Sequence, residues 1–189
     1  PTGPTSADII AGLAPAVAAI IEARPNLDII PGGVKLSAIP VTYGDEWKLA
    51  EALDPIAARY DWILIDCPPA WGMITILGLV AAARGILSPI TLEPAGVRSF
   101  VQFRANLQRL ASIRELAVDW ILPTAVDRRR SMTTEIREQL AAAGGHLLPG
   151  IPQSAAVAAS PAWHQTIWEH DPKGSAAAAY QSVIEVLTQ

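Results

Sequence analysis

Asp66 follows a continuous apolar run, Trp62-Ile63-Leu64-Ile65, and such a run is typical of a strand buried on both faces. A carboxylate held at the end of a buried strand can orient the water shell of a Mg²⁺ ion bound to nucleotide phosphates. Pro68 and Pro69 stiffen the loop that follows, and Gly72 is expected to supply backbone freedom there. The pattern indicates metal-assisted phosphate chemistry, but it is equally typical of an acid that only caps a turn.

The other residues that could do chemistry favour packing roles. Cys67 is the only cysteine in the sequence, which excludes an internal disulfide and a cysteine-rich metal site and indicates a reducing, intracellular setting. We expect its thiol to be packed and inert, because no histidine lies nearby in the sequence. His146, His164 and His170 do not have the spacing of metal ligands, and surface or packing roles are expected for them.

Arginines are concentrated in one acid-free stretch, from residue 94 to residue 114. On a helix, Arg98 and Arg109 fall within about 20° of each other, whereas Arg104 and Arg114 point elsewhere. Two interpretations stay open, a solvated helix surface and nonspecific DNA binding through phosphate contacts. The chain has 14 Lys and Arg against 18 Asp and Glu, a net charge of −4, so any DNA contact must come from a local patch such as this one or Arg128-Arg129-Arg130.

The elements that must position these residues alternate along the chain. Helical periodicity is found over residues 6–23, 45–59 (with Pro55 as a kink or a break), 95–112, 131–143 and 174–187. Apolar runs predict strands over residues 27–31, 62–66, 85–90, 117–122 and 146–151. Strands separated by helices of a dozen or more residues require crossover connections, which predicts an α/β fold: a doubly wound, mostly parallel sheet with helices on both faces.

Composition and length restrict the class of protein. With 51% of 189 residues in the hydrophobic set and 17% charged, the chain has enough apolar material for one core, and a single domain over residues 1–189 is expected. The same composition excludes a disordered segment. The longest uncharged apolar stretches run for about 10 residues, short of the roughly 20 that cross a bilayer, which excludes a transmembrane protein. No membrane partner is expected. Nor does the start of the chain resemble a signal peptide.

Residues 60–72, which read YDWILIDCPPAWG, closely resemble the Walker B and switch II segment of the ParA/MinD family of deviant P-loop ATPases. Three further segments resemble the family and follow in its order: residues 88–95 (SPITLEPA), 119–130, and 150–180 with its I-P turn and DPKG step. The resemblance covers nearly the whole chain. It implies a P-loop NTPase-like fold and a ParA-like ATPase of plasmid or chromosome partition.

The resemblance also implies roles for individual residues. Asp66 would be the catalytic residue, organising Mg²⁺ through water during ATP hydrolysis. The positions that the resemblance marks as nucleotide-binding are Thr2, Gly3, Pro68, Pro69, Gly72, Thr124, Asp127 and Pro152. ATP would close two subunits into a homodimer that binds DNA nonspecifically through Arg98, Arg104 and Arg109. A ParB-like partner protein would then stimulate hydrolysis, in the bacterial cytoplasm at the nucleoid.

One departure from the family concerns the phosphate loop. Family members open with a strand and a loop of the form K-G-G-x-G-K-T, whereas Gly32-Gly33 lacks that spacing. Pro1-Thr2-Gly3 resembles the P-x-G that follows the switch I aspartate, so the analogy places about 40 residues upstream, including the central strand and the P-loop. We therefore expect the 189 residues alone to be inactive and poorly stable, with two unpaired sheet edges. The alternative is a degenerate relative that has repaired its sheet differently.

Two other functions stay open. A MinD-like positioning ATPase would end in a basic amphipathic helix, whereas this chain has no Lys or Arg after Lys173. A non-catalytic interaction module would have kept the fold and lost the P-loop. The upstream coding sequence would discriminate between this module and an ATPase.

Overall fold

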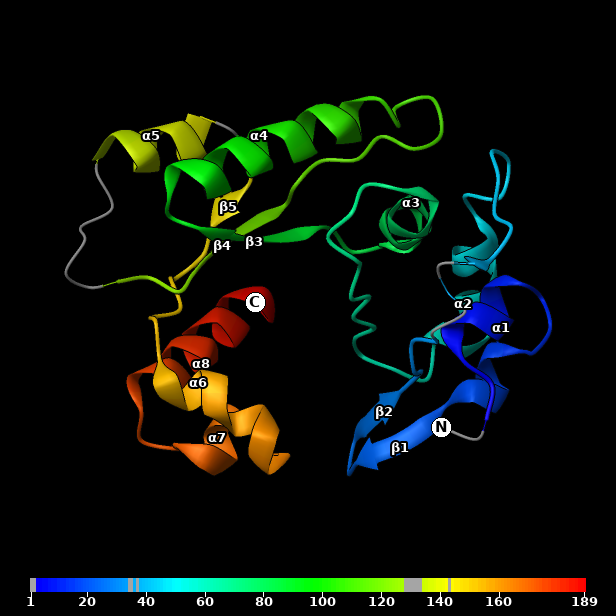
Figure 1. Ribbon diagram of the computed structural model, residues 1–189, viewed down its shortest axis with the longest axis horizontal. Coiled ribbons are helices and arrows are strands. Elements are labelled where there is room, and N and C mark those ends of the chain that lie inside the picture. Colours follow the sequence, from blue (N-terminus) through cyan, green and yellow to red (C-terminus); the bar gives the residue numbers. More distant parts are fainter. Residues whose placement is uncertain (1–2, 34–35, 37, 128–133, 143) are drawn as a thin grey trace. The chain divides into compact units, whose positions relative to one another are not determined.

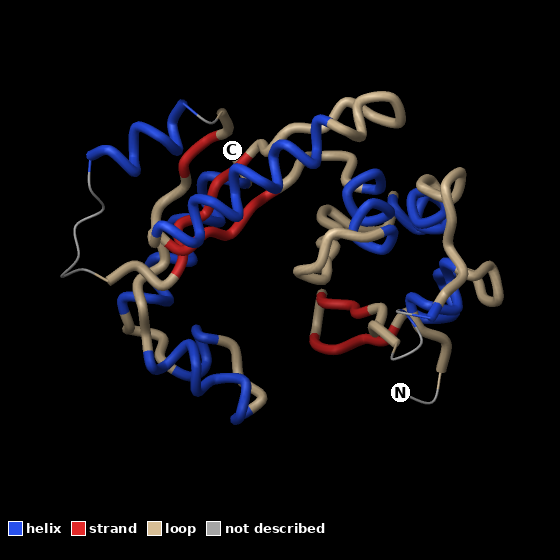
Figure 2. Tube along the Cα trace, turned by 45° about the horizontal axis from the view of Figure 1, so that its top comes forward, coloured by secondary structure: helices blue, strands red, loops and turns tan. Residues whose placement is uncertain are grey.

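The computed structural model describes residues 3–33, 36, 38–127, 134–142 and 144–189. Thr2 and the 128–130 arginine run, which the sequence singled out, lie outside these ranges. The chain divides into a first unit, Pro1–Arg84, and a second unit, Gly85–Gln189. The first unit contains a two-stranded hairpin and the second a three-stranded sheet, both drawn in red in Figure 2. No helix within the described ranges is long and apolar enough to span a membrane.

The first unit begins with short elements in place of the long helix predicted over residues 6–23. They are α1 (Ser6–Ile10), the 3₁₀ helix η1 (Ala16–Ala19) and β1 (Ile21–Arg24). The prediction of one continuous helix is wrong because Gly12 takes a φ of +72° and Pro15 lacks the N–H that a helix interior needs. Of the apolar side chains in this stretch, Ile9, Ala16 and Ala19 are buried, whereas Leu13 is 78% exposed and Val17 53%.

Strand β1 pairs with β2 (Leu27–Ile29) as an antiparallel hairpin in which Ile21 lies opposite Ile29. The predicted strand over residues 27–31 is therefore present over three residues, but it is not a member of a parallel sheet. The connection is too short for a parallel crossover, and Asn26 turns the chain with a φ of +62°.

Helix α2 (Lys48–Ala57) continues through Pro55, so the chain is not broken there. Proline removes one helical hydrogen bond. Packing offsets this loss, because Ile56, the next residue, lies in a buried cluster with Ile9, Ala16 and Ala19. Helix α3 (Met73–Ala81), which the sequence pattern did not predict, is buried from Thr75 to Val80.

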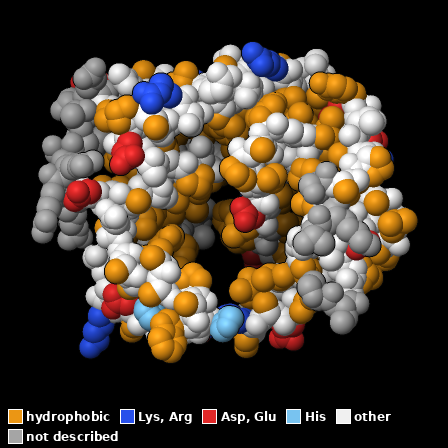
Figure 3. Space-filling model, in the orientation of Figure 1, with side chains coloured by type: hydrophobic (Ala, Val, Ile, Leu, Met, Phe, Trp, Pro, Cys, Tyr) orange, Lys and Arg blue, Asp and Glu red, His pale blue; other side chains and the backbone are white. Residues whose placement is uncertain are grey.

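Residues 62–66 are not a strand, and the prediction of a doubly buried strand at this position is wrong. A strand requires a hydrogen-bonded neighbour, and no strand of the described ranges pairs with this segment. Its apolar side chains are consequently open to solvent: Trp62 is 38% exposed, Ile63 39% and Leu64 87%. Hydrophobic atoms reach the surface over much of the face drawn in Figure 3.

The second unit carries the parallel sheet, in the order β3 (Leu87–Thr91), β4 (Trp120–Thr124) and β5 (His146–Leu147). Helices α4 (Pro94–Gln108) and α5 (Thr134–Ala142) lie on one face of this sheet and α8 (Ser175–Leu187) on the other (Figure 1). The α8 residue Val183 packs with Leu122, Leu148 and Ile151. The α/β class, with a parallel sheet and helices on both faces, is confirmed.

Strand boundaries in the second unit differ from the predicted ones by a few residues. The segment predicted over residues 146–151 keeps only two ladder residues, because Pro149 has no N–H to donate. The chain nevertheless continues along β4, since Leu148 N donates to Ile121 O at 2.9 Å and Ile151 N to Pro123 O at 2.8 Å. Three short helices were not predicted, because four or five residues are too few for periodicity to detect: α6 (Ala155–Ala159), η3 (Ser160–Trp163) and α7 (Ile167–His170).

A hydrogen bond between side chains joins the end of α2 to the hairpin and leads to a testable prediction. Tyr60 Oη donates to Asp28 Oδ2 at 2.6 Å, and this bond, with partial burial and the charge of Asp28, raises the pKa of Tyr60 above 10.0. A raised folded-state pKa means that the bond stabilises the fold fully below pH 10 and is lost as the pH rises through the raised value. We predict that Tyr60→Phe lowers the urea midpoint at pH 8.

The matched control is Tyr43→Phe, because Tyr43 is 88% exposed. Its urea midpoint should equal that of the unmodified chain at every pH. The gap between Tyr60→Phe and the unmodified chain should close above pH 10, since a phenolate cannot donate to a carboxylate. Equal midpoints at pH 8 would contradict the prediction.

Candidate functional site

Asp66 lies on an irregular segment between α2 and α3, and its carboxylate is exposed to solvent. Helix α3 begins where an apolar sequence, MITILGLVA, follows Gly72, and its buried side chains anchor the end of the segment. Pro68 and Pro69 are exposed in the intervening loop. The carboxylate is therefore accessible to water and to a water-coordinated ion, although no β-ladder holds it.

The role expected of Gly72 is wrong in one respect. Its φ is −170° and its ψ −179°, an extended conformation that any residue adopts, and a Cβ built there would meet nothing within 4 Å. Gly72 is the N-cap of α3 and needs no glycine-specific geometry. The close approach in this region occurs at Gly78, where a Cβ would lie 2.5 Å from Cys67 Sγ.

Cys67 is packed against this glycine and is partly buried. Burial raises the pKa of the thiol above 9.0, and the adjacent negative charge of Asp66 raises it further. Both effects keep the sulfur protonated at neutral pH, where a thiol is a poor nucleophile.

Two loops at the carboxyl edge of the parallel sheet are joined by backbone hydrogen bonds. Val126 N donates to Ile151 O and Gln153 N donates to Val126 O, both at 3.0 Å, and Val126 and Pro152 form an isolated parallel bridge. The structure thereby brings together three of the expected nucleotide-binding positions, Thr124, Asp127 and Pro152. Thr124 is anchored in turn, because its Oγ1 donates to Ile90 O of β3 at 3.3 Å.

Ala125, between these positions, is a feature that the sequence did not reveal. Its φ of +51° lies in the left-handed region, which alanine rarely adopts. Strained residues of this kind persist where the surrounding structure holds them, and here the hydrogen bonds of Val126 do so. Only a glycine or asparagine would have signalled this turn from the sequence.

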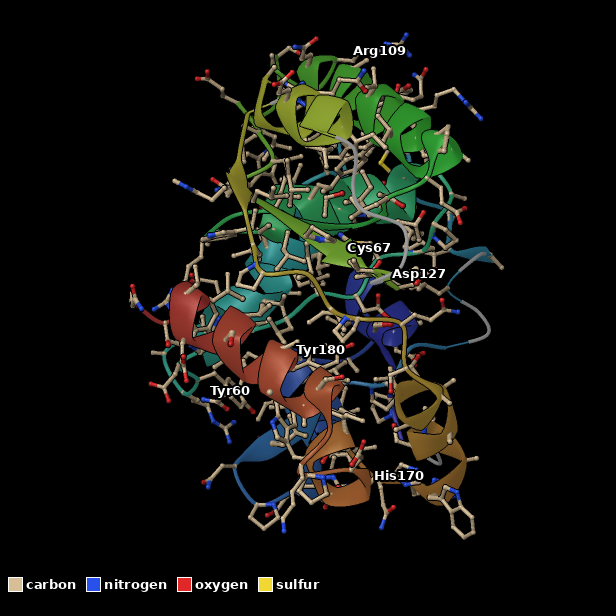
Figure 4. All side chains as sticks on the ribbon, turned by 90° about the vertical axis from the view of Figure 1, so that its left-hand side faces the viewer. Tyr60, Cys67, Arg109, Asp127, His170 and Tyr180 are labelled. Carbon is tan, nitrogen blue, oxygen red and sulfur yellow. The ribbon has the colours of Figure 1, made fainter. Side chains whose placement is uncertain are left out.

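The three arginines expected to contact DNA differ in their surroundings. Arg98 on α4 and Arg109, the C-cap of α4, are exposed. Arg104 is half-buried and lines a cavity of about 140 Å³ with Leu107, Val118 and Gly144. In Figure 4, Arg109 lies at the top of the view and Asp127 near its middle, so Arg109 is not beside Asp127.

The described residues fit part of a nucleotide site. They contain no cluster of three or more His, Cys, Asp or Glu that could hold a metal ion. A Mg²⁺ ion, however, needs only one or two protein carboxylates when water and phosphate oxygens complete its shell, and Asp66 is exposed for that purpose. A glycine-rich phosphate loop is not present in the printed sequence. Gly3 is exposed, with nothing within 4 Å of a Cβ built on it.

Comparison with known proteins adds independent information. A family model described as an AAA domain (AAA_31) matches residues 7–117. The chain is 27% identical over 184 residues to the chromosome partitioning protein ParA of Caulobacter vibrioides, covering 92% of this chain and 68% of that relative.

Solved structures agree on the fold. A variant of Cyanothece McdA in complex with ATP has a TM-score of 0.83 at 22% identity and covers 100% of this chain and 76% of that one. The cell division ATPase MinD of Pyrococcus furiosus has a TM-score of 0.73 at 20% identity, with 98% of this chain and 75% of that one covered. From the sequence motif around Asp66, the parallel sheet and these matches together, the chain belongs to the ParA/MinD family of P-loop ATPases.

Proposed function

We propose that this protein is a ParA-like partition ATPase that binds ATP and Mg²⁺, forms a homodimer and binds DNA nonspecifically. The observation that carries the proposal is the exposed carboxylate of Asp66, which lies in the motif that resembles the family. The match to a chromosome partitioning protein covers 92% of this chain. The relative is a chromosome partitioning protein, and one structural neighbour is an ATP complex.

The proposal gives the expected nucleotide-binding residues different roles. Asp66 accepts hydrogen bonds from the water shell of Mg²⁺, and the ion would neutralise charge on the phosphates. The joined loops that carry Thr124, Asp127 and Pro152 provide a preformed edge for the adenine ring, because the bonds between Val126, Ile151 and Gln153 hold them in place. Thr2 and Gly3 would belong to switch I.

The proposal requires a phosphate-binding loop, since one carboxylate cannot replace the backbone amides and lysine of such a loop. In the family this loop precedes the region that matches the present chain. The activity experiments below therefore use the full gene product, read from its start codon, rather than the 189 residues alone.

DNA binding is proposed for the arginine-rich α4. Arg98 and Arg109 are exposed cations, and α4 carries no Asp or Glu. Such a surface neutralises phosphates without reading bases. A ParB-like partner that stimulates hydrolysis, and association with the nucleoid in the cytoplasm, complete the proposal.

One prediction of the proposed function concerns ATP turnover. In the full gene product, Asp66→Ala should lower kcat by at least about 100-fold, the usual effect of removing a group that stabilises transition-state charge. The measurement is phosphate release under saturating Mg-ATP. Asp61→Ala is the matched control, because Asp61 is an exposed carboxylate five positions earlier on the same irregular segment. Equal turnover by the two variants would make Asp66 an ordinary turn residue.

Another prediction of the proposed function concerns DNA affinity. Replacing both Arg98 and Arg109 by alanine should weaken binding to unrelated duplexes alike and flatten the log–log salt slope by about two units, roughly 0.9 for each lost phosphate contact. Fluorescence anisotropy across a salt series measures this slope in the ATP-bound protein. Lys173→Ala removes an exposed cation outside α4 and should leave the slope unchanged. An unchanged slope in the double variant would contradict the prediction and mean that α4 is a solvated surface without phosphate contacts.

A further inference from the structure

Thr75 is a buried hydroxyl in an otherwise apolar helix. It is the third residue of α3, whose sequence is MITILGLVA, and it is 6% exposed. Burying a hydroxyl is costly unless it forms a hydrogen bond. The nearby backbone provides that bond, which connects the helix to the loop after Asp66.

Two carbonyl oxygens of this loop lie within reach of the Thr75 hydroxyl. Oγ1 donates to Ala70 O at 2.7 Å, and Pro68 O lies 3.4 Å away. A hydroxyl has one proton, so the short contact with Ala70 is the principal bond. The side chain thus holds the middle of the loop against the first turn of a buried helix.

A second contact fixes the same segment one helical turn further along. Thr75 and Gly78 are three residues apart and share one face of α3. At Gly78 the segment passes so close that a Cβ would lie 2.5 Å from Cys67 Sγ and 3.3 Å from Ile65 Cγ2. One face of α3 therefore contacts the chain on both sides of Asp66. Thr75 donates a hydrogen bond to Ala70 O, and Gly78 lies close to Ile65 and Cys67, the two residues that flank Asp66.

These contacts compensate for a support that the segment lacks. Residues 62–66 have no ladder partner among the described strands, so backbone pairing does not locate the Asp66 carboxylate. Pro68 and Pro69 have fixed φ angles, and a stiff connection transmits the position of Ala70 back to Asp66. We propose that Thr75 is a positioning residue for Asp66, acting through its hydrogen bond to the Ala70 carbonyl. The inference rests on the proposed function only where it assigns Asp66 to ATP hydrolysis.

Cys67 provides a test that needs no nucleotide. As the only cysteine, adjacent to Asp66, it reports the seating of this segment through its rate of reaction with a disulfide reagent such as DTNB. Thr75→Val keeps the branched shape and removes the hydroxyl. It should speed labelling about fivefold, because the loss of one hydrogen bond changes an equilibrium constant by about that factor. Thr75→Ser keeps the hydroxyl and should label like the unmodified chain.

The control is Thr42→Val, which removes an exposed threonine hydroxyl elsewhere in the first unit and should not change the rate. Should circular dichroism show Thr75→Val to be unfolded, Thr75→Ala replaces it, because this variant also removes the hydroxyl that donates to Ala70 O. A labelling rate that is unchanged in the folded variant, or equally raised by Thr75→Ser, overturns the proposal.

The second arm uses the full gene product. Thr75→Val should lower kcat for ATP at least about tenfold with little change in KM, and Thr75→Ser should restore kcat, since a misplaced carboxylate affects the reaction more than binding. If the unmodified protein does not hydrolyse ATP, the proposed function fails, while the labelling experiment still decides whether Thr75 seats the segment. Full turnover by Thr75→Val in an active protein overturns the positioning role.

Discussion

Parallel pairing of β3, β4 and β5 is the constraint on which the second unit depends. Strands that run the same way must be connected across a face of the sheet, so α4 and α5 cover one face and α8 fills the other. The same pairing brings the carboxyl ends of the strands to one edge. There, the loops after β4 and β5 exchange backbone hydrogen bonds at Val126, and residues distant in sequence become neighbours.

The same requirement for a backbone partner explains the irregular segment around Asp66. Its sequence has the composition of an interior strand, yet it pairs with no described strand, and its apolar side chains remain exposed. Local contacts cover part of this surface: the Arg84 guanidinium lies 4.5 Å from the centre of the Trp62 ring. The segment has the apolar composition of a sheet strand, but contacts other than strand pairing hold it in place.

Helix α3 provides the contacts that hold the segment around Asp66. A helix that is apolar apart from one threonine can be buried deeply, and the threonine then becomes a fixed donor for the loop above it. Glycine at position 78 lets the chain approach closely on the same face. Rigid support of this kind is what a functional carboxylate needs, because its usefulness depends on where it is held.

The sequence by itself determined the α/β class, the crossover pattern of the second unit and the family, because apolar runs, helical periodicity and the YDWILIDCPPAWG motif are local signals. Asp66 belongs to that motif, and the resemblance to the family marked Thr124, Asp127 and Pro152. Tertiary structure alone decided the break after α1, the survival of α2 across Pro55, the antiparallel hairpin and the absence of a strand at residues 62–66. It also decided the left-handed Ala125 and the partners of Thr75. These outcomes depend on which segments lie side by side, because burial and backbone pairing are satisfied by residues far away in the chain, and no local pattern records them.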